Sequence, residues 1–306
     1  MLALAPPSGV SLRSATALLV DHAGAESNTC VGLARLGLRT AWVSCLGADA
    51  AGDRILAGIA DEGVDVRWVA RSATRPTGLM LKDPDAGVRY YRLESAASAM
   101  GPALLDRVPV ARARAVLVTG VTALIGATAQ AAGLALLDRA RGLRVVDPNL
   151  RLGLWGSDRR AALVRPFVEQ CDLVLAGFDE LAEVLGAAAA GQPERSDAAG
   201  AAEALARAAA AVGPREVVIR GASSVGVLAD GMWSEIGIRR GVAVDPIGAG
   251  DAFNAGYIAV RLRGGAVEVA LREGVRCGAA VTTALSDTGA FPRTLDPPLH
   301  RQHHEP

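Results

Sequence analysis

The chain has 306 residues, of which 51% are apolar, and its 32 Lys and Arg residues are balanced by 32 Asp and Glu residues. A chain of this length and composition can bury a substantial core, so a globular protein of one or two domains is expected. Zero net charge offers no basic surface to a phosphate backbone, and no apolar run approaches the roughly 18 residues of a membrane span, so neither nucleic acid nor a membrane is an expected partner.

Short apolar runs suited to buried strands alternate with helical patterns along most of the chain. Segments rich in Ala and Leu, with a period of 3.6 residues, separate the strand candidates, which are residues 41–46, 115–119, 143–147, 173–176 and 216–220. Strands that alternate with helices form mainly parallel sheets with helices on both faces. The sequence therefore predicts a three-layer α/β/α sandwich, with residues 1–306 forming a single domain.

Two segments in the first third of the chain differ from this alternation. Residues 77–97 alternate in polarity on both sides of the turn sequence DPDAG, which is typical of a β-hairpin, and an extended stretch at residues 12–22 could pair with it. We expect these segments, about residues 8–22 and 74–98, to form a small β-sheet lid inserted in the α/β core. Because the lid would have exposed edges, we also expect a homo-oligomer that assembles through it.

Scarce residue types are more informative here than common ones, because the chain contains 31 arginines. Lys82 is the only lysine, and the other scarce positions are Asn28, Asn149, Asn254, Tyr90, Tyr91 and Tyr257. The four cysteines, at positions 30, 45, 171 and 277, are far apart and show no CxxC spacing. This spacing predicts reduced, buried thiols rather than disulfides or a zinc site. Together with the lack of a secretory pattern in residues 1–7, it predicts a cytoplasmic location.

The most informative motif is VDPIGAGDAFNAGY at residues 244–257, where a short strand runs into small residues and then into a helix. Backbone N–H groups at such a helix N-terminus bind anions. Asp251 could take a proton from an attacking hydroxyl while the amides of Gly248, Ala249 and Gly250 stabilise a transferring phosphoryl group. The alternative is that Asp251 only caps the helix.

This motif resembles the second signature of the PfkB (ribokinase-like) carbohydrate kinases. AGAESN at residues 23–28, followed by Gly37 and by GADAAG at residues 47–52, is similar to the first signature of that family. The resemblance implies one α/β sandwich with a β-lid, MgATP as phosphoryl donor, and Asp251 as the base that deprotonates a sugar hydroxyl. It also leaves room for a monovalent cation. No GxxxxGK[ST] string occurs, so a Walker-type site is not expected.

Two segments in the middle of the chain indicate a substrate. YYRLESAAS at residues 90–98 and DPNLRLGLW at residues 147–155 resemble segments typical of 2-dehydro-3-deoxygluconate (KDG) kinases within this family. A sugar acid presents a carboxylate and hydroxyls, which arginine, tyrosine and asparagine side chains can bind. The substrate-binding residues that the resemblance implies are Gly24, Asn28, Tyr90, Arg92, Asn149 and Arg151.

The same resemblance places the nucleotide in the second half of the chain. RGASS at residues 220–224 is similar to the family's glycine loop over ATP, and CGAA at residues 277–280 to the small-residue helix beside the adenine. Glu180 falls where the family has an acidic residue that holds Mg²⁺ through water. The implied ATP-binding residues are Gly177, Arg220, Gly221, Ser224, Gly248, Gly250, Cys277 and Ala280.

Four positions depart from the family pattern, namely Ala23, Gly177, Ile219 and Ser224. They leave two alternatives open: a kinase for another sugar or a nucleoside, such as ribose, fructose or adenosine, and a family member that binds a sugar acid without phosphorylating it. A fifth departure is a missing inner strand ahead of residues 1–7. Either such a strand, about ten residues or ~33 Å long, precedes Met1 in the native protein, or the sheet lacks most of an inner strand. We expect the first, and an intact mass that begins at Met1 would contradict it.

Overall fold

The structure is a computed structural model that describes residues 1–150, 157–186, 200–238, 244–284 and 286–296. Its strands are β1 (Leu2–Ala5), β2 (Leu19–His22), β3 (Ser44–Gly47), β4 (Val69–Ser72), β5 (Leu79–Asp83), β6 (Gly87–Tyr91), β7 (Ala115–Thr119), β8 (Leu143–Asp147), β9 (Leu173–Gly177), β10 (Glu216–Arg220), β11 (Ser224–Ala229) and β12 (Met232–Gly237). Its α-helices are α1 (Ala25–Arg35), α2 (Ala50–Asp61), α3 (Gly120–Leu124), α4 (Ala127–Arg139), α5 (Ser157–Gln170), α6 (Phe178–Leu185), α7 (Ala201–Ala210), α8 (Ala249–Arg261) and α9 (Val267–Val281). Three 3₁₀ helices, η1 (Ala96–Ala99), η2 (Pro102–Arg107) and η3 (Val110–Arg112), connect the lid to β7.

The central sheet has six strands in the order β12-β11-β10-β9-β8-β7. Strands β7 to β10 are parallel, and β11 and β12 extend the sheet as an antiparallel hairpin. Side chains alternate between the two faces of a strand. On β9, Val174 therefore packs in the core on one face, with Phe167 of α5, while Leu173 packs in the core on the other, with Tyr257 of α8. Helices thus cover both faces, and the predicted sandwich is confirmed.

The predicted strand at residues 41–46 is displaced toward the C-terminus in the structure. Strand β3 begins at Ser44, pairs in parallel with β4, and forms a separate two-stranded sheet. Ala41 makes only an isolated parallel bridge to Asp65, formed by the hydrogen bonds from Trp42 N to Asp65 O and from Asp65 N to Thr40 O, both 2.9 Å long. An apolar run alone does not indicate where a strand finds a continuous partner.

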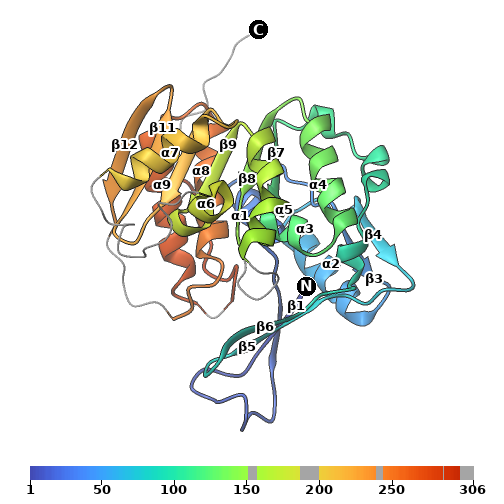
Figure 1. The fold of residues 1–306 in the computed structure, drawn as a ribbon. Helices are drawn as coiled ribbons and strands as arrows, with labels where there is room; N and C mark the ends of the chain where they lie inside the picture. Colours follow the sequence, from blue (N-terminus) through green and yellow to red (C-terminus); the bar gives the residue numbers. More distant parts are fainter. Residues whose placement is uncertain (151–156, 187–199, 239–243, 285, 297–306) are drawn as a thin grey trace.

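The lid is a four-stranded sheet in the order β2-β1-β5-β6, and it projects from the sandwich (Figure 1). Its β5–β6 hairpin lies within the predicted segment 77–97. Strand β1 lies between β2 and β5, antiparallel to the first and parallel to the second. The predicted lid segments 8–22 and 74–98 omit β1, since its sequence LALA lacks the alternating polarity that marked the hairpin.

A cleft of about 930 Å³ separates the β3–β4 sheet from β7, and Trp42, Ser44, Val116 and Val118 are among its lining residues. Within the described residues, β3 and β7 do not pair with each other, so the sheet is interrupted here. The strand expected ahead of Met1 stays a prediction. In the part of the chain that the structure describes, no helix is both long and apolar enough to cross a membrane.

Candidate active site

The site is built around the tight turn that starts α8. Gly248 is the N-cap residue and has a φ of 86°, a left-handed conformation that favours glycine. A Cβ atom on Gly248 would lie 2.5 Å from the carbonyl oxygen of Asp287. Because the first backbone N–H groups of a helix have no intrahelical acceptor, the start of α8 presents donors and a partial positive charge to an anion. The predicted GAGD segment therefore has the geometry of an anion hole.

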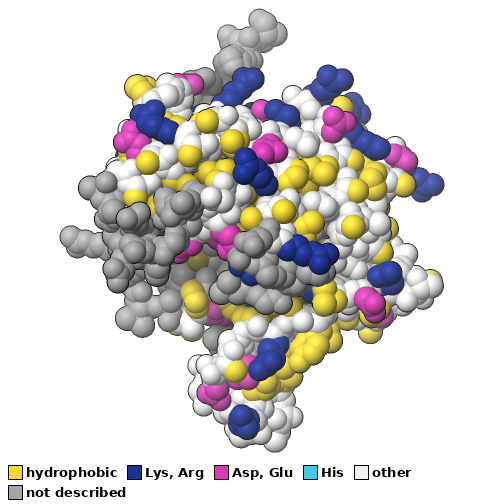
Figure 2. All heavy atoms as spheres, in the orientation of Figure 1, with side chains coloured by type: hydrophobic (Ala, Val, Ile, Leu, Met, Phe, Trp, Pro, Cys, Tyr) yellow, Lys and Arg dark blue, Asp and Glu magenta, His cyan; other side chains and the backbone are white. Residues whose placement is uncertain are grey.

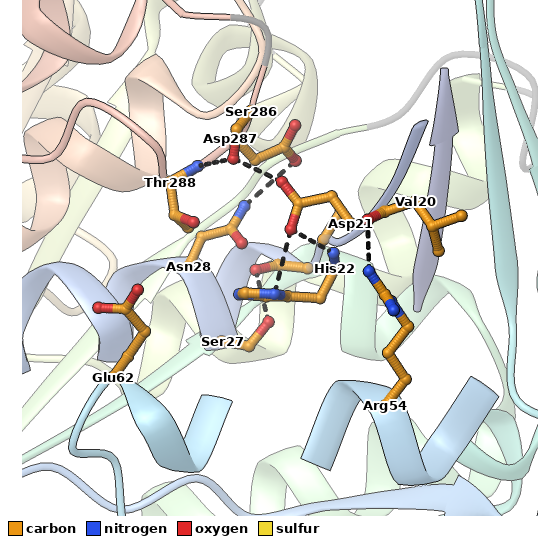
Figure 3. A network of polar contacts seen from close by, with 12 residues as sticks. Val20, Asp21, His22, Ser27, Asn28, Arg54, Glu62, Ser286, Asp287 and Thr288 are labelled. Atoms are coloured by element: carbon orange, nitrogen blue, oxygen red, sulfur yellow. Dashed lines mark hydrogen bonds and ion pairs between the residues drawn. The ribbon is translucent and has the colours of Figure 1, made fainter. Parts of the chain in front are cut away.

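Asp251 lies in the first turn of α8 and is only 5% exposed. The side-chain amide of Asn28, from α1, donates a hydrogen bond of 2.8 Å to Asp251 Oδ2 and lies 3.4 Å from Asp287 Oδ2. Figure 3 shows this amide pointing at Asp287. The Oδ1 atom of Asn28 is buried and has no donor among the described residues. Buried acceptors are normally satisfied, so a ligand hydroxyl suits this position.

A pocket of about 270 Å³ adjoins the anion hole. It is lined by Asp147, Asn149, Glu180, Arg220, Pro246, Ile247, Gly248, Gly250 and Asp251. The structure thus brings together residues predicted for the substrate, the nucleotide, the metal and the proton transfer. Asn149, at the end of β8, has a φ of 37°, and its buried Oδ1 has no protein donor in the described part of the chain. It is a second candidate acceptor for a ligand.

Arg220, the last residue of β10, is the cation of this pocket. Its guanidinium donates to Asp147 (3.3 Å), to Asn254 Oδ1 (3.0 Å) and to the carbonyl of Gly250 (3.2 Å). Burial alone would lower the pKa of Arg220, but the charges of Asp147 and Glu180 outweigh it and raise this pKa. The guanidinium therefore stays charged and joins the sheet to the first turn of α8.

Glu180 is the predicted Mg²⁺ residue, and it stands at the rim of the same pocket. Its Oε2 accepts a hydrogen bond of 3.0 Å from the backbone N–H of Gly177 and lies 3.9 Å from Arg220. Among the described residues, no cluster of three or more His, Cys, Asp or Glu side chains could hold a metal ion directly. One carboxylate in a polar pocket fits a hydrated Mg²⁺ that is held through water and phosphate oxygens.

Tyr90 and Arg92, which the sequence predicts to bind the sugar acid, lie at the end of lid strand β6 and directly after it. The Arg92 guanidinium stacks 4.2 Å from the ring centre of Tyr90, and Arg92 is only 5% exposed. Arg92 and Gly24 both line the larger cleft, which extends to Met1. Arg151 lies outside the described residues, so its role stays a prediction.

The predicted glycine loop is a tight turn between β10 and β11. Gly221 N donates to the carbonyl of Ser224 (2.9 Å), and the Ser224 hydroxyl donates to Glu235 of β12. Ile219, one of the departures from the family pattern, is buried in the core beneath the turn. The turn can therefore offer backbone atoms to a nucleotide, while the Ser224 hydroxyl already has an acceptor.

The predicted adenine neighbours lie near the end of α9. Cys277 is fully buried, and a Cβ atom on Gly256 of α8 would lie 2.9 Å from its Sγ. Burial raises the pKa of Cys277 to about 12. The thiol thus packs between two helices, and the half-buried Ala280, one turn further on, is the more accessible of the two. Ala23, another departure, is buried at the N-terminus of α1.

Sequence reasoning missed the charged residues that surround Asp251. Lys82 Nζ, from β5 of the lid, donates to Asp245 Oδ2 (2.6 Å) and to Asp287 Oδ1 (2.7 Å). Asp147, fully buried, accepts a 2.7 Å bond from Asn254 Nδ2. Two signals were present in the sequence, because Lys82 is its only lysine and Asn254 one of three asparagines.

An α/β/α sandwich with a projecting lid and a carboxylate beside an anion hole defines the class of sugar-phosphorylating enzymes. The chain matches the model of the pfkB family of carbohydrate kinases over residues 8–293. It is 33% identical over 280 residues to the 2-dehydro-3-deoxygluconokinase of Bacillus subtilis, covering 88% of this chain and 83% of the relative. It is 30% identical over 306 residues to the 2-dehydro-3-deoxygalactonokinase of Haloferax volcanii, covering 94% of this chain and 90% of the relative.

Solved structures agree with this result. A PfkB protein from Polaromonas sp. JS666 superposes with a TM-score of 0.81 at 32% identity, over 96% of this chain and 95% of that chain. The 2-dehydro-3-deoxygluconokinase of Thermotoga maritima gives a TM-score of 0.82 at 25% identity, over 96% of this chain and 94% of that chain. The chain belongs to the PfkB family of carbohydrate kinases. The predicted family and fold class are confirmed.

Proposed function

We propose that the protein transfers the terminal phosphoryl group of ATP to a sugar acid, and that this substrate is KDG, phosphorylated on its 6-hydroxyl. The observation that carries the proposal is the buried Asp251 carboxylate, which Asn28 orients beside the anion hole of α8. The similarity to kinases named for dehydro-deoxy sugar acids in Bacillus subtilis and Haloferax volcanii supports this substrate class.

In the proposed reaction, Asp251 takes the proton of the sugar hydroxyl as that oxygen attacks the phosphoryl group. The backbone N–H groups at the start of α8 stabilise the charge that develops on the phosphoryl oxygens. Mg²⁺, when bound, neutralises phosphate charge, and Glu180 is the residue that would hold it through water. Arg220 fixes the first turn of α8 through the carbonyl of Gly250.

The sugar acid would lie between the lid and the carboxyl ends of the central strands. The unsatisfied Oδ1 atoms of Asn28 and Asn149 suit sugar hydroxyls, which donate hydrogen bonds. Arg92, held over Tyr90, and Arg151 are the proposed carboxylate contacts. An arginine guanidinium matches a carboxylate with two parallel hydrogen bonds, which distinguishes a sugar acid from a neutral sugar.

A coupled assay of ADP formation tests the proposal, with KDG, its galactose epimer, ribose, fructose and adenosine as acceptors. We expect turnover with the sugar acids and little with the neutral acceptors. Running the assay with and without K⁺ tests the expected monovalent cation. A clear preference for ribose, fructose or adenosine would contradict the proposed substrate.

Asp251→Asn should lower kcat by at least about a thousandfold, because the amide cannot accept the proton, while thermal stability and ATP binding stay near those of the wild type. Asp138→Asn, on the exposed face of α4, is the matched control and should keep full activity. Near-normal turnover of Asp251→Asn would contradict the proposed mechanism.

A second candidate function is sugar-acid binding without catalysis. It is favoured by two contacts that occupy groups predicted for MgATP: Glu180 accepts a hydrogen bond from the backbone N–H of Gly177, and the Ser224 hydroxyl donates to Glu235. Calorimetric titration with MgATP separates the two functions. Heat of binding at millimolar ATP supports the kinase, and its absence together with binding of KDG supports the sugar-acid sensor.

We also propose that two copies of the chain associate through their lids. By strand register, Val20, Leu4 and Leu81 share one face of the lid, while Met80 and Ala3 face the opposite way and are buried. Figure 2 shows hydrophobic side chains close together on the lid. An apolar sheet face of this kind is normally covered, and a second lid is the occupant that we propose.

A further inference from the structure

We propose that Lys82 is a positioning residue for phosphoryl transfer, because its ammonium group ties the lid to both sides of the anion hole. The inference rests on the proposed kinase function for its kinetic consequence, but its structural part concerns only how the lid is held. Lys82 comes from β5 in the lid, and its two carboxylate partners come from loops of the sandwich 163 and 205 residues further along the chain.

The contacts of Lys82 are short and largely shielded from water. Nζ lies 2.6 Å from Asp245 Oδ2 and 2.7 Å from Asp287 Oδ1, and the side chains of Lys82, Asp245 and Asp287 are 13%, 11% and 4% exposed. One cation therefore bridges two carboxylates in a site of low exposure. Ion pairs of this kind are strongly coupled, because removing one partner leaves a buried charge uncompensated.

Both residues contact the turn that forms the anion hole, Asp245 through its carboxylate and Asp287 through its backbone. Asp245 Oδ1 accepts a hydrogen bond of 2.9 Å from Ile247 N, one residue before Gly248. A Cβ atom on Gly248 would lie 2.5 Å from the carbonyl oxygen of Asp287. The backbone of residue 287 therefore packs against the turn itself. A displacement of residue 245 or of residue 287 would thus move the backbone donors of this turn.

Asp287 also connects Lys82 to the proposed base. The Asn28 amide lies between Asp287 Oδ2 (3.4 Å) and Asp251 Oδ2 (2.8 Å), so the ammonium group and the base are joined through one carboxylate and one amide. Asp245, Asp251 and Asp287 bring three carboxyl groups together at a site that we propose binds anionic substrates, which carboxylates would repel. Lys82 supplies the positive charge that this arrangement requires.

A second contact shows that the lid is docked on the same loop. Ser286 donates a hydrogen bond of 2.5 Å to Asp21 of β2, and Figure 3 shows the Asp21 carboxylate directed at Ser286. Lid strands β2 and β5 thus both attach to residues 286–287. Since Asp21 is half-exposed and Asp287 is buried, Lys82 makes the better shielded of the two attachments.

The test compares Lys82→Met with Lys82→Arg, which keeps the charge, and with Arg89→Met, which removes an exposed cation from the neighbouring lid strand β6. Two quantities are measured on the full-length protein: hydrogen–deuterium exchange of peptides covering β5 and β6, without substrate, and kcat and KM for KDG and for ATP. Thermal unfolding of each variant shows that it is folded.

We expect Lys82→Met to accelerate exchange in β5 and β6 at least tenfold and to lower kcat/KM for KDG at least tenfold, with KM for ATP changed less than threefold. Lys82→Arg should recover most of both effects, and Arg89→Met should resemble the wild type. Unchanged exchange in folded Lys82→Met would overturn the proposal, as would equal effects in Lys82→Met and Arg89→Met. If the wild type phosphorylated no sugar acid, the proposed function would fail, while the exchange measurement would still decide how the lid is held.

Discussion

Gly248 occupies the most constrained backbone position of the site, and its substitution separates two causes of damage. Gly248→Ala combines a left-handed φ of 86° with a Cβ atom 2.5 Å from a backbone oxygen that cannot rotate away. The matched control is Gly264→Ala, which has a φ of 78° but no atom within 4 Å of its Cβ. Both variants carry the cost of the left-handed conformation, about 1–2 kcal/mol.

Only Gly248→Ala should also shift the anion hole. We expect this variant to lose at least about a hundredfold in kcat and to unfold at lower urea concentration than Gly264→Ala, which should keep its activity. Steady-state kinetics and urea unfolding check both points. Similar activity in the two variants would mean that the turn of α8 does not contribute to the reaction.

The residues of the site differ in how well they could be predicted from the sequence. Asp251 and Gly248 stand in a motif that predicts an anion site at a helix N-terminus, and Asn28 and Asn149 belong to a scarce residue type. Lys82, the only lysine, belongs to a still scarcer type, but no local pattern connects it to Asp287. Its partners meet it only through the fold, across more than 160 residues, which no spacing within a motif can indicate.

Helix α8 carries Asp251 at one end and is anchored to the sheet near the other. Arg261 donates two hydrogen bonds, of 3.0 and 2.8 Å, to the Glu216 carboxylate of β10, and the Tyr257 hydroxyl donates to the same carboxylate. Tyr257→Phe should destabilise the protein by about 1 kcal/mol at pH 8, since Arg261 still satisfies Glu216.

The same anchor predicts a dependence on pH. Burial, reinforced by the charge of Glu216, raises the pKa of Tyr257 well above its ordinary value. The folded state holds the neutral phenol, whereas the unfolded chain ionises near pH ~10, so the contribution of Tyr257 is present below that pH and is lost as the pH rises above it. Urea midpoints at pH 8 and 10.5 should therefore fall further for the wild type than for Tyr257→Phe. Equal decreases would contradict the prediction.

At the scale of elements, the predicted strands 115–119, 143–147 and 216–220 match β7, β8 and β10, because each is a short apolar run buried on both faces. The prediction of strands was less accurate where the neighbouring strand determines the bounds of a strand or the sheet that it joins. Strand β3 starts at Ser44 because β4 is its neighbour there, and β1 joins the lid because β2 and β5 enclose it. Pairing of this kind depends on contacts distant in sequence.

The whole molecule has zero net charge, yet it is expected to hold two anionic substrates, the sugar acid beneath the lid and ATP against the sandwich. Its positive charges are local: Arg220 beside Asp147, Lys82 between Asp245 and Asp287, and Arg92 over Tyr90. Arg220 and Lys82 are each held by carboxylates from other elements, whereas Arg92 stacks on Tyr90, two residues before it. The position of the Lys82 charge therefore depends on how the lid sits on the sandwich, so the attachment of the lid also affects the charge at the site.

Assembly of two chains would hold that arrangement in place, and the outward face of the lid is where it can be tested. Leu81→Glu puts a charge in the middle of this face without touching the inward row of Ala3 and Met80. If lids associate in pairs, burying the charge should dissociate them, because even a pair with Arg89 of β6, the register partner of residue 81, has to desolvate both charges. Met232→Glu is the control, since Met232 is 71% exposed on β12, outside the lid.

Light scattering coupled to size-exclusion chromatography should then show a dimer for the wild type and for Met232→Glu, and a monomer for Leu81→Glu. The monomer should keep its thermal stability within a few degrees, because Leu81 is only half-buried within one chain. It should also show a raised KM for the sugar acid, since the lid of the monomer no longer packs against a second lid. A monomeric wild type, or a Leu81→Glu variant that remains dimeric, would refute assembly through the lid.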